Sequence, residues 1–276
     1  MAVWFVTGSS RGLGLHTARA ALNQGHQVVA TARQPKDVES ALGEHNDALL
    51  VLPLDVTSET QAQHATGQAI DRFGRIDVLV NNAGRGLLGA VEEATDVEVR
   101  ELFQTNVFGL LTVTRAVLPI MRGQRSGHVL NISSVGGFTG APGWGVYNGT
   151  KFAVEGISEA MRAELAPLGI RVTIIEPGVF RTDFLDGSSL RSTEPIADYA
   201  QTAGATRGWA AATNHNQPGD PVKAAQRIVE ITDQSAPPLR LQLGADCVAR
   251  VEAKLDNMAG ELAAQRDIAM STGITS

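Results

Sequence analysis

Short apolar runs rich in valine, isoleucine and leucine alternate with longer amphipathic segments along the first 180 residues of the chain. Parallel strands require crossover segments of about a dozen residues or more, and strands that are apolar throughout are covered on both faces. The alternation therefore predicts an α/β fold, a single Rossmann-type doubly wound parallel sheet of about seven strands with helices on both faces. We expect strands at residues 2–6, 27–31, 48–53, 77–81, 128–132 and 170–176, and helices at residues 11–24, 58–73, 96–122 and 147–167.

The pattern changes after residue 178. Residues 180–218 are rich in Gly, Ser, Thr and Asn and show little periodicity, yet they include Phe184, Leu185 and Trp209. So long an irregular segment is uncommon inside a compact domain unless it has a function, and we interpret it as a substrate lid. We expect residues 1–276 to form one domain, completed by a helix at residues 220–232, a strand at 239–243 and a C-terminal helix at about 245–265.

Composition narrows the class of protein further. Hydrophobic residues make up 43% of the chain and its net charge is −6, which excludes a disordered chain and argues against nucleic acid as a partner. No apolar run approaches the roughly 18 residues of a membrane span, and the first residues lack a basic leader. The six histidines and the single cysteine, Cys247, form no metal-ligand motif. We therefore expect a cytoplasmic protein that binds neither membrane nor metal.

A glycine-rich turn, Thr7-Gly8-Ser9-Ser10-Arg11-Gly12-Leu13-Gly14, follows the first predicted strand and opens the first helix. Glycine lets the backbone approach a pyrophosphate closely, and the free N–H groups of the helix N-terminus attract the anion. This context predicts a dinucleotide site. The turn also fits the G-x-S-x-G elbow of α/β-hydrolases, with Ser10 as nucleophile and Asp186 and His215 as partners. That elbow usually follows a strand deep in the sheet and leaves Gly14 unexplained, so hydrolysis is the weaker hypothesis.

The residues at the end of the second predicted strand indicate whether NAD(H) or NADP(H) binds. An acidic residue there would hold the ribose 2′-hydroxyl of NAD, but the strand ends in Ala32 and Arg33 follows. Arg11 lies in the glycine-rich turn, and two guanidinium groups near one ribose can clamp a 2′-phosphate through charge-assisted hydrogen bonds. The sequence therefore favours NADP(H) over NAD(H). The alternative is that both arginines are solvated surface charges.

Tyr147 and Lys151 are spaced by four residues on a predicted helix, so their side chains share one face. A tyrosine has an ordinary pKa near 10 and is a poor acid or base at neutral pH, but a nearby lysine cation favours the phenolate and lowers that pKa. Such a pair can pass a proton to or from a substrate oxygen. By itself the spacing is weak evidence, because similar pairs occur on many solvated helix faces.

Taken together, these features resemble the short-chain dehydrogenase/reductase family, in its compact branch. The resemblance covers residues 3 to about 182, and its motifs recur in the family's order and approximate spacing. Besides the glycine-rich turn, it is carried by Leu54-Asp55-Val56, Asn81-Asn82-Ala83-Gly84, Asn106, Ser134, Tyr147, Lys151 and Pro177-Gly178.

The resemblance implies roles for the matching residues. Tyr147 would be the general acid/base, and Lys151 would bind the nicotinamide ribose and lower the tyrosine pKa. Ser134 would hydrogen-bond the substrate oxygen, although the adjacent Ser133 is distinguished from it only by family spacing. Asn106 would hold a water in the proton relay. The cofactor-binding residues would be Gly8, Ser10, Arg11, Gly12, Leu13, Gly14, Arg33, Asp55, Val56, Asn82, Ala83, Gly84, Tyr147, Lys151, Pro177, Gly178, Val179 and Thr182.

These residues predict an NADP-dependent alcohol dehydrogenase or carbonyl reductase. The apolar residues of the lid favour a bulky hydrophobic substrate, with Trp144, Phe184 and Leu185 as candidate contacts. Two alternatives keep the fold: reduction of a C=C bond or dehydration, and a cofactor-binding sensor or scaffold without turnover. In the family, the helices that match residues 96–122 and 147–167 pair with their symmetry mates. We therefore expect a homo-oligomer, a dimer rather than a tetramer.

Overall fold

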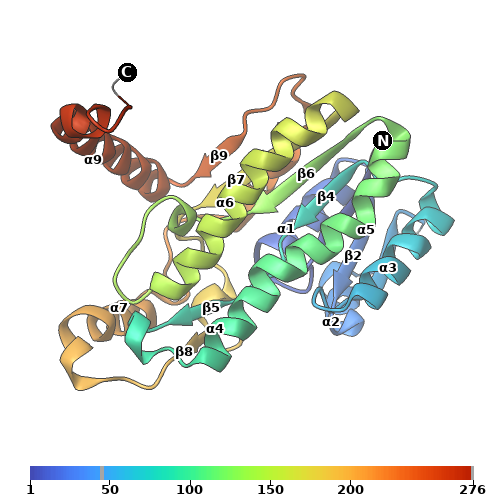
Figure 1. Cartoon of the computed structure of the whole chain (residues 1–276). Helices are drawn as coiled ribbons and strands as arrows, with labels where there is room; N and C mark the ends of the chain where they lie inside the picture. The colour runs from blue at the N-terminus through green and yellow to red at the C-terminus, as the bar shows by residue number, and fades with distance from the viewer. Residues whose placement is uncertain (44–46, 275–276) are drawn as a thin grey trace.

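The computed structural model describes residues 1–43 and 47–274, so residues 44–46 and 275–276 of the predicted domain 1–276 lie outside the described residues. Its main sheet has seven strands in the order β3-β2-β1-β4-β6-β7-β9, and every neighbouring pair is parallel (Figure 1). This order confirms the predicted doubly wound α/β fold. The strands are β1 (Val3–Thr7), β2 (Gln27–Ala32), β3 (Leu49–Pro53), β4 (Val78–Asn81), β6 (Gly127–Ile132), β7 (Ile170–Pro177) and β9 (Arg240–Leu243).

Helices cover both faces of this sheet. Ala18, Val38 and Ile228 bring one group of helices onto the first face, where they pack with Trp4 and Val80. The second face packs in the same way against apolar residues of the other group. Strands buried on both sides explain why the sequence runs are apolar throughout. The first group is α1 (Gly12–Asn23), α2 (Pro35–Leu42) and α8 (Pro221–Glu230); the second is α3 (Glu59–Phe73), α5 (Gly109–Gln124) and α6 (Gly145–Leu165).

The helix predicted at residues 96–122 is not one regular α-helix. It consists of α4 (Asp96–Phe103), a π-helical turn (Gln104–Phe108) and α5. Single π-turns inside helices are often found at functional sites, and this one holds Asn106. The short helix α2 was not predicted, because only Val38 and Leu42 are buried and its eight residues give little periodicity.

A second sheet, of two strands, was also not predicted from the sequence. It pairs β5 (Gly86–Leu88) with β8 (Leu190–Ser192), and three residues are too few to show a strand period. This sheet fixes the start of the predicted lid beside the segment that follows Gly84. The rest of the lid contains short helical turns and α7 (Ala205–Thr213).

The C-terminal helix α9 (Ala245–Met270) is longer than the predicted 245–265, and it projects away from the body of the molecule (Figure 1). None of the helices in the described part of the chain combines the length and apolar character needed to cross a membrane.

Candidate active site

A large cleft lies at the carboxyl ends of β1, β4, β6 and β7, where open α/β sheets bind their ligands. Its cavity volume is about 1120 Å³, slightly above the usual range for small-molecule sites. Two predicted site residues, Gly14 and Asn106, do not line it. The others do: Gly8, Ser10, Arg11, Gly12, Leu13, Arg33, Asp55, Val56, Asn82, Ala83, Gly84, Ser134, Trp144, Tyr147, Lys151, Pro177, Gly178, Val179, Thr182, Phe184 and Leu185.

The glycine-rich turn has the geometry of a cradle for a phosphate. Gly8 and Gly12 have φ angles of +67° and +57°, which favour glycine because it has no Cβ. A Cβ on Gly14 would lie 2.4 Å from the carbonyl oxygen of Gly8, so a side chain there would break the turn. The Asn82 amide donates hydrogen bonds to the carbonyl oxygens of Thr7 and Gly8 at 2.9 and 3.0 Å, which joins the turn to β4. These observations fit a dinucleotide pyrophosphate at the start of α1.

The two arginines expected to select NADP(H) line the same cleft. Arg11 Nη1 donates to Ser188 Oγ at 2.7 Å and its Nη2 donates to the Ser188 carbonyl oxygen at 2.8 Å. Arg33 is exposed. Arg11 therefore joins the glycine-rich turn to the lid, and the phosphate clamp stays a prediction.

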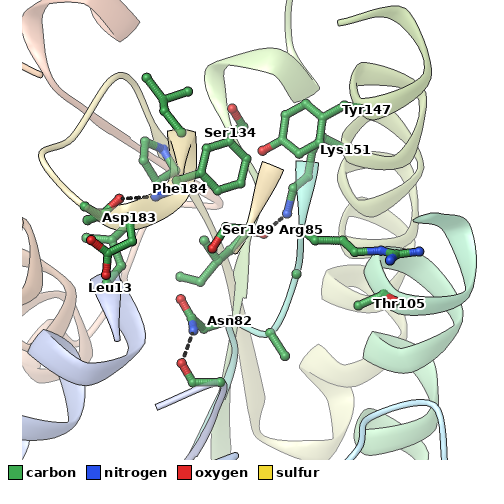
Figure 2. Close-up of a pocket in the computed structure, with 18 of the residues that line it drawn as sticks. Leu13, Asn82, Arg85, Thr105, Ser134, Tyr147, Lys151, Asp183, Phe184 and Ser189 are labelled. Atoms are coloured by element: carbon green, nitrogen blue, oxygen red, sulfur yellow. Dashed lines mark hydrogen bonds between the residues drawn. The ribbon is translucent and has the colours of Figure 1, made fainter. Parts of the chain in front are cut away.

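Tyr147, Ser134 and Lys151 converge at the other end of the cleft (Figure 2). Tyr147 and Lys151 are on α6, whereas Ser134 follows the end of β6. Lys151 Nζ donates to the carbonyl oxygen of Ile132 at 2.8 Å and lies 5.9 Å from the centroid of the Tyr147 ring. A helix face and a strand end thus bring together one hydroxyl, one phenol and one amine.

Burial controls the pKa values of both α6 groups. Burial raises the pKa of Tyr147 to about 12, and the neighbouring Ser134 hydroxyl opposes that shift. Burial also lowers the pKa of Lys151 to about 8, against the attraction of Glu155. In the polypeptide by itself, loss of hydration sets the direction of the Tyr147 shift, and a lowering of that pKa by Lys151 stays a prediction.

The structure distinguishes the two adjacent serines. Ser134 lies beside Tyr147 and lowers the pKa of that phenol, and its Oγ accepts from the backbone N–H of Gly136 at 3.0 Å. Ser133 is almost fully buried and lies beside Glu155. This arrangement supports Ser134, rather than Ser133, as the serine that contacts a substrate.

Asn106 ties the π-helical turn to two neighbouring segments. Its Oδ1 accepts from the Arg85 backbone N–H at 3.0 Å. Its Nδ2 donates to the Arg85 carbonyl oxygen at 2.9 Å and to Thr150 Oγ1 at 3.1 Å. The side chain therefore holds the residue after Gly84 against the helix of Tyr147, and its place in a proton relay stays a prediction.

Aromatic rings surround the phenol of Tyr147. The ring centroids of Trp144 and Phe184 are each 5.6 Å from that of Tyr147. Trp144 and Phe184 stack at 6.5 Å with an interplanar angle of 20°, so the lid contributes one wall of this apolar corner. Leu185 lines the cleft nearby and, like Trp144, packs against the cluster of Leu88, Leu190 and Ala210.

Comparison with known proteins establishes the family. The short chain dehydrogenase profile matches residues 2–192. The chain is a short-chain dehydrogenase/reductase. It is 40% identical over 247 residues to oxidoreductase BOA17 of Botryotinia fuckeliana, covering 89% of this chain and 90% of that protein. It is 39% identical over 241 residues to a 3-ketodihydrosphingosine reductase of Bacteroides thetaiotaomicron, covering 87% and 86%. A short-chain dehydrogenase structure from Streptomyces avermitilis has a TM-score of 0.92 at 40% identity, covering 99% and 100%.

This short-chain dehydrogenase/reductase is therefore an oxidoreductase that uses a nicotinamide cofactor and acts on CH–OH or carbonyl groups of small molecules. Hydrolysis has no support in the site. In the part of the chain that the structure describes, Ser10 makes no hydrogen bond to His215, and Asp186 accepts from the Ser188 backbone N–H at 2.9 Å.

Sequence analysis missed several residues of the cleft. Arg85, Ser188 and Arg250 also line it, although they come from three distant parts of the chain. Arg85 follows the Asn-Asn-Ala-Gly motif directly, which was a usable signal. Ser188 and Arg250 belong to no motif, and only the tertiary fold brings the lid and α9 to this site.

Proposed function

We propose that the chain is an NADP(H)-dependent carbonyl reductase, which reduces a ketone or an aldehyde and oxidises the secondary alcohol in the reverse direction. The observation that carries this proposal is the position of Tyr147, a buried phenol that lines the apolar end of the cleft together with Ser134 and Lys151. A pure cofactor-binding protein would not need this arrangement of a phenol, a hydroxyl and an amine.

The residues of the site divide the work of the reduction. The nicotinamide, when bound, supplies the hydride that adds to the carbonyl carbon. Since the pKa of Tyr147 is raised to about 12, its phenol is protonated at neutral pH and can donate that proton to the carbonyl oxygen. Ser134 donates a hydrogen bond to the same oxygen and holds it beside the phenol. The Lys151 ammonium lies close enough to stabilise the phenolate that remains.

The preference for NADP(H) rests on Arg11 and Arg33, which both line the phosphate end of the cleft. Two guanidinium groups favour the extra charge of a 2′-phosphate, and Ala32 provides no carboxylate to bind a free 2′-hydroxyl. Arg11 already bonds with Ser188 of the lid, so a phosphate held by Arg11 would lie beneath the lid.

The substrate proposed here is a bulky hydrophobic carbonyl compound. Trp144 and Phe184 form an apolar wall against Tyr147, and Leu185 extends it. Burying such a wall against an apolar substrate stabilises the complex by about 25 cal/mol per Å² of apolar surface. The name of the Bacteroides relative, a 3-ketodihydrosphingosine reductase, supports a ketone with a long apolar part.

Pairing of two copies through α5 and α6 is part of the same proposal. Phe108, directly before α5, is 50% exposed, and Phe152 on α6 is 47% exposed. Large aromatic side chains on neighbouring elements are typical anchors of a protein–protein interface.

A substrate panel tests the reaction and the substrate class together. The chain would be mixed with NADPH and with ketones and aldehydes that range from small and hydrophilic to long-chain or aromatic. We expect the reduced nicotinamide absorbance to fall fastest with bulky apolar carbonyls and the product to be the alcohol. Turnover of only small hydrophilic ketones or sugars would refute the substrate class. A product with a reduced C=C bond, or water loss, would replace the reaction with one of its two alternatives.

A further inference from the structure

Most of α9 is exposed to solvent. Cys247 and Val251 are buried and pack with Val135 and Phe138. After Val251, every residue to the end of the helix is exposed except Lys254, which is half-buried. This free arm, residues 252–270, is about 28 Å long at 1.5 Å per residue and projects into solvent (Figure 1).

One face of the arm is an apolar stripe. Leu255, Met258 and Leu262 are 51%, 50% and 63% exposed. They continue the buried Val251 at intervals of four, three and four residues, which is the a/d spacing of a heptad repeat. The next d position is the polar Gln265 and the next a position is Ala269, so the apolar stripe ends at Leu262. Apolar side chains at this spacing meet the same positions of a second helix as knobs in holes.

A helix of this length and sequence needs a partner for that stripe. Isolated helices shorter than about 12–15 residues are marginal in water, and Gly260, which costs about 1 kcal/mol relative to alanine, divides the arm into two pieces of that kind. Most helix stability in proteins comes from packing of an apolar face. The arm also contains four acidic residues and two basic ones, which is the wrong balance for a helix that lies on an anionic membrane surface.

The charges that flank the stripe suit a second copy of the same chain. With Leu255 and Leu262 at a positions, Glu261 falls on a g position and Arg266 on the following e position. In a parallel two-stranded coil, a g residue faces the next e residue of the other strand. Glu261 would therefore lie opposite Arg266 of the partner subunit, and the reciprocal pair would form across the two-fold axis.

From these observations we infer that the α9 arm binds the equivalent arm of a second copy, stripe to stripe, as a short parallel coiled coil. This interface is separate from the α5 and α6 surface, so the two interfaces used together would join more than two copies. It does not depend on the reaction that the site performs. Arg250 lies in the first turns of α9 and lines the cleft. The proposed pairing of the arms would place this residue next to a contact between subunits.

Cross-linking through an introduced cysteine tests the pairing directly. Native Cys247 is buried and its pKa is raised to about 12, so the wild-type chain is a silent background for thiol oxidation. Met258→Cys places a thiol on the stripe at a d position, whereas Asn257→Cys places an equally exposed thiol one residue away. Under mild oxidation at micromolar concentration, we expect a disulfide-linked dimer from Met258→Cys in at least tenfold excess over Asn257→Cys. No cross-link at position 258, or equal yields at both positions, would overturn the proposal.

Sedimentation of charged variants provides a second test. Met258→Glu/Leu262→Glu adds two carboxylates to the stripe, and Asn257→Glu/Ala264→Glu adds two to the opposite face. We expect the particle of the stripe variant either to have half the mass of the wild-type particle or to dissociate at a concentration at least tenfold higher. The control variant should associate like the wild type. Equal association of both variants, or a wild type that is already a 29 kDa monomer, would contradict the inference. Far-UV circular dichroism and NADPH binding confirm that each variant is folded.

Discussion

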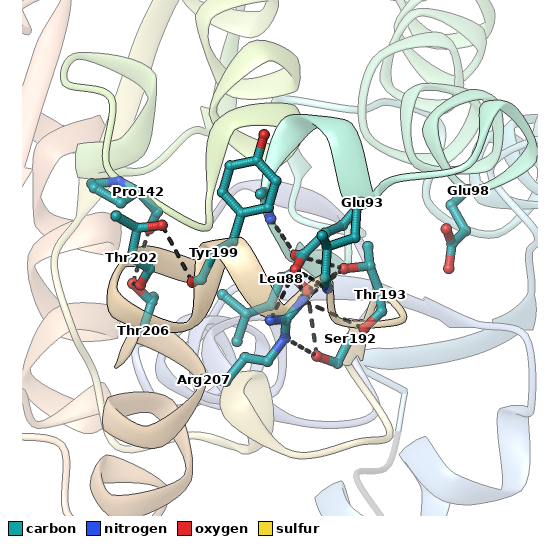
Figure 3. A network of polar contacts seen from close by, with 12 residues as sticks. Leu88, Glu93, Glu98, Pro142, Ser192, Thr193, Tyr199, Thr202, Thr206 and Arg207 are labelled. Atoms are coloured by element: carbon teal, nitrogen blue, oxygen red, sulfur yellow. Dashed lines mark hydrogen bonds and ion pairs between the residues drawn. The ribbon is translucent and has the colours of Figure 1, made fainter. Parts of the chain in front are cut away.

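Arg207 of the lid helix α7 and Glu93 form a short, largely buried ion pair, with 2.5 Å between Arg207 Nη2 and Glu93 Oε2 (Figure 3). The Glu93 side chain is fully buried, and its carboxylate also accepts from the backbone N–H groups of Ala90 and Ile196 at 2.7 and 2.8 Å. Arg207 and these hydrogen bonds hold the pKa of Glu93 at about 2. The lid is thus joined to the segment before α4 by the buried Glu93 carboxylate, which requires the positive charge of Arg207.

Removing the arginine should destabilise the folded chain. Arg207→Leu leaves the Glu93 carboxylate buried without its cation, and such a change costs roughly 3–5 kcal/mol. Urea unfolding monitored by circular dichroism measures the difference. The matched control is Arg227→Leu, which breaks the exposed pair of Arg227 with Glu230 and should cost less than about 1 kcal/mol. Equal losses in the two variants would show that the Glu93–Arg207 pair does not stabilise the fold.

Cofactor selection should depend on the arginine after β2. Arg33→Ala removes one guanidinium from the 2′-phosphate, and loss of a hydrogen bond to a charged group should weaken NADPH binding by roughly tenfold to a hundredfold. NADH affinity should change little, because NADH lacks that phosphate. Calorimetric titration of both cofactors into wild type and variant gives the comparison. If the variant loses affinity for NADPH and NADH equally, or for neither cofactor, Arg33 does not bind the 2′-phosphate.

His128 should make stability fall in acid. The ring is fully buried on β6, its Nε2 pairs with Thr173 Oγ1 at 2.9 Å, and burial lowers its pKa from 6.5 to about 3. The folded state therefore keeps the ring neutral while the unfolded chain takes up a proton below pH 6.5. This residue alone should cost about 1.4 kcal/mol per pH unit between pH 6.5 and its folded pKa.

Urea midpoints between pH 4 and pH 8 measure that slope. His128→Gln should flatten the acid limb, whereas His64→Gln, a change at an exposed position of α3, should leave it as in the wild type. An unchanged slope in His128→Gln would mean that other groups cause the acid sensitivity.

The parallel α/β class of the sheet, the glycine-rich turn and the Tyr147–Lys151 pair were predictable because each depends on local sequence. Buried parallel strands are apolar throughout, and residues four apart on a helix share a face. The link between Asn106 and Thr150 was not predictable, because it depends on a π-helical turn that no simple period signals.

The electrostatics of the site depend on burial, which the sequence does not report. The spacing of Tyr147 and Lys151 suggested a lowered tyrosine pKa, yet the phenol is so well buried that its pKa rises to about 12. The ion pair of Glu93 and Arg207 joins residues more than a hundred positions apart, so the sequence did not predict that these two residues would pair.

The most direct test of the account compares Tyr147→Phe with the wild type in both turnover and cofactor binding. Phenylalanine keeps the aromatic packing against Trp144 and Phe184 but removes the proton donor. With NADPH and the best carbonyl of the panel, we predict that the variant loses about 10²-fold to 10⁴-fold in kcat. It should bind NADPH within about threefold of the wild type, and Tyr199→Phe should behave like the wild type. A Tyr147→Phe variant that reduces the carbonyl at the wild-type rate would contradict the assignment of Tyr147 as the proton donor.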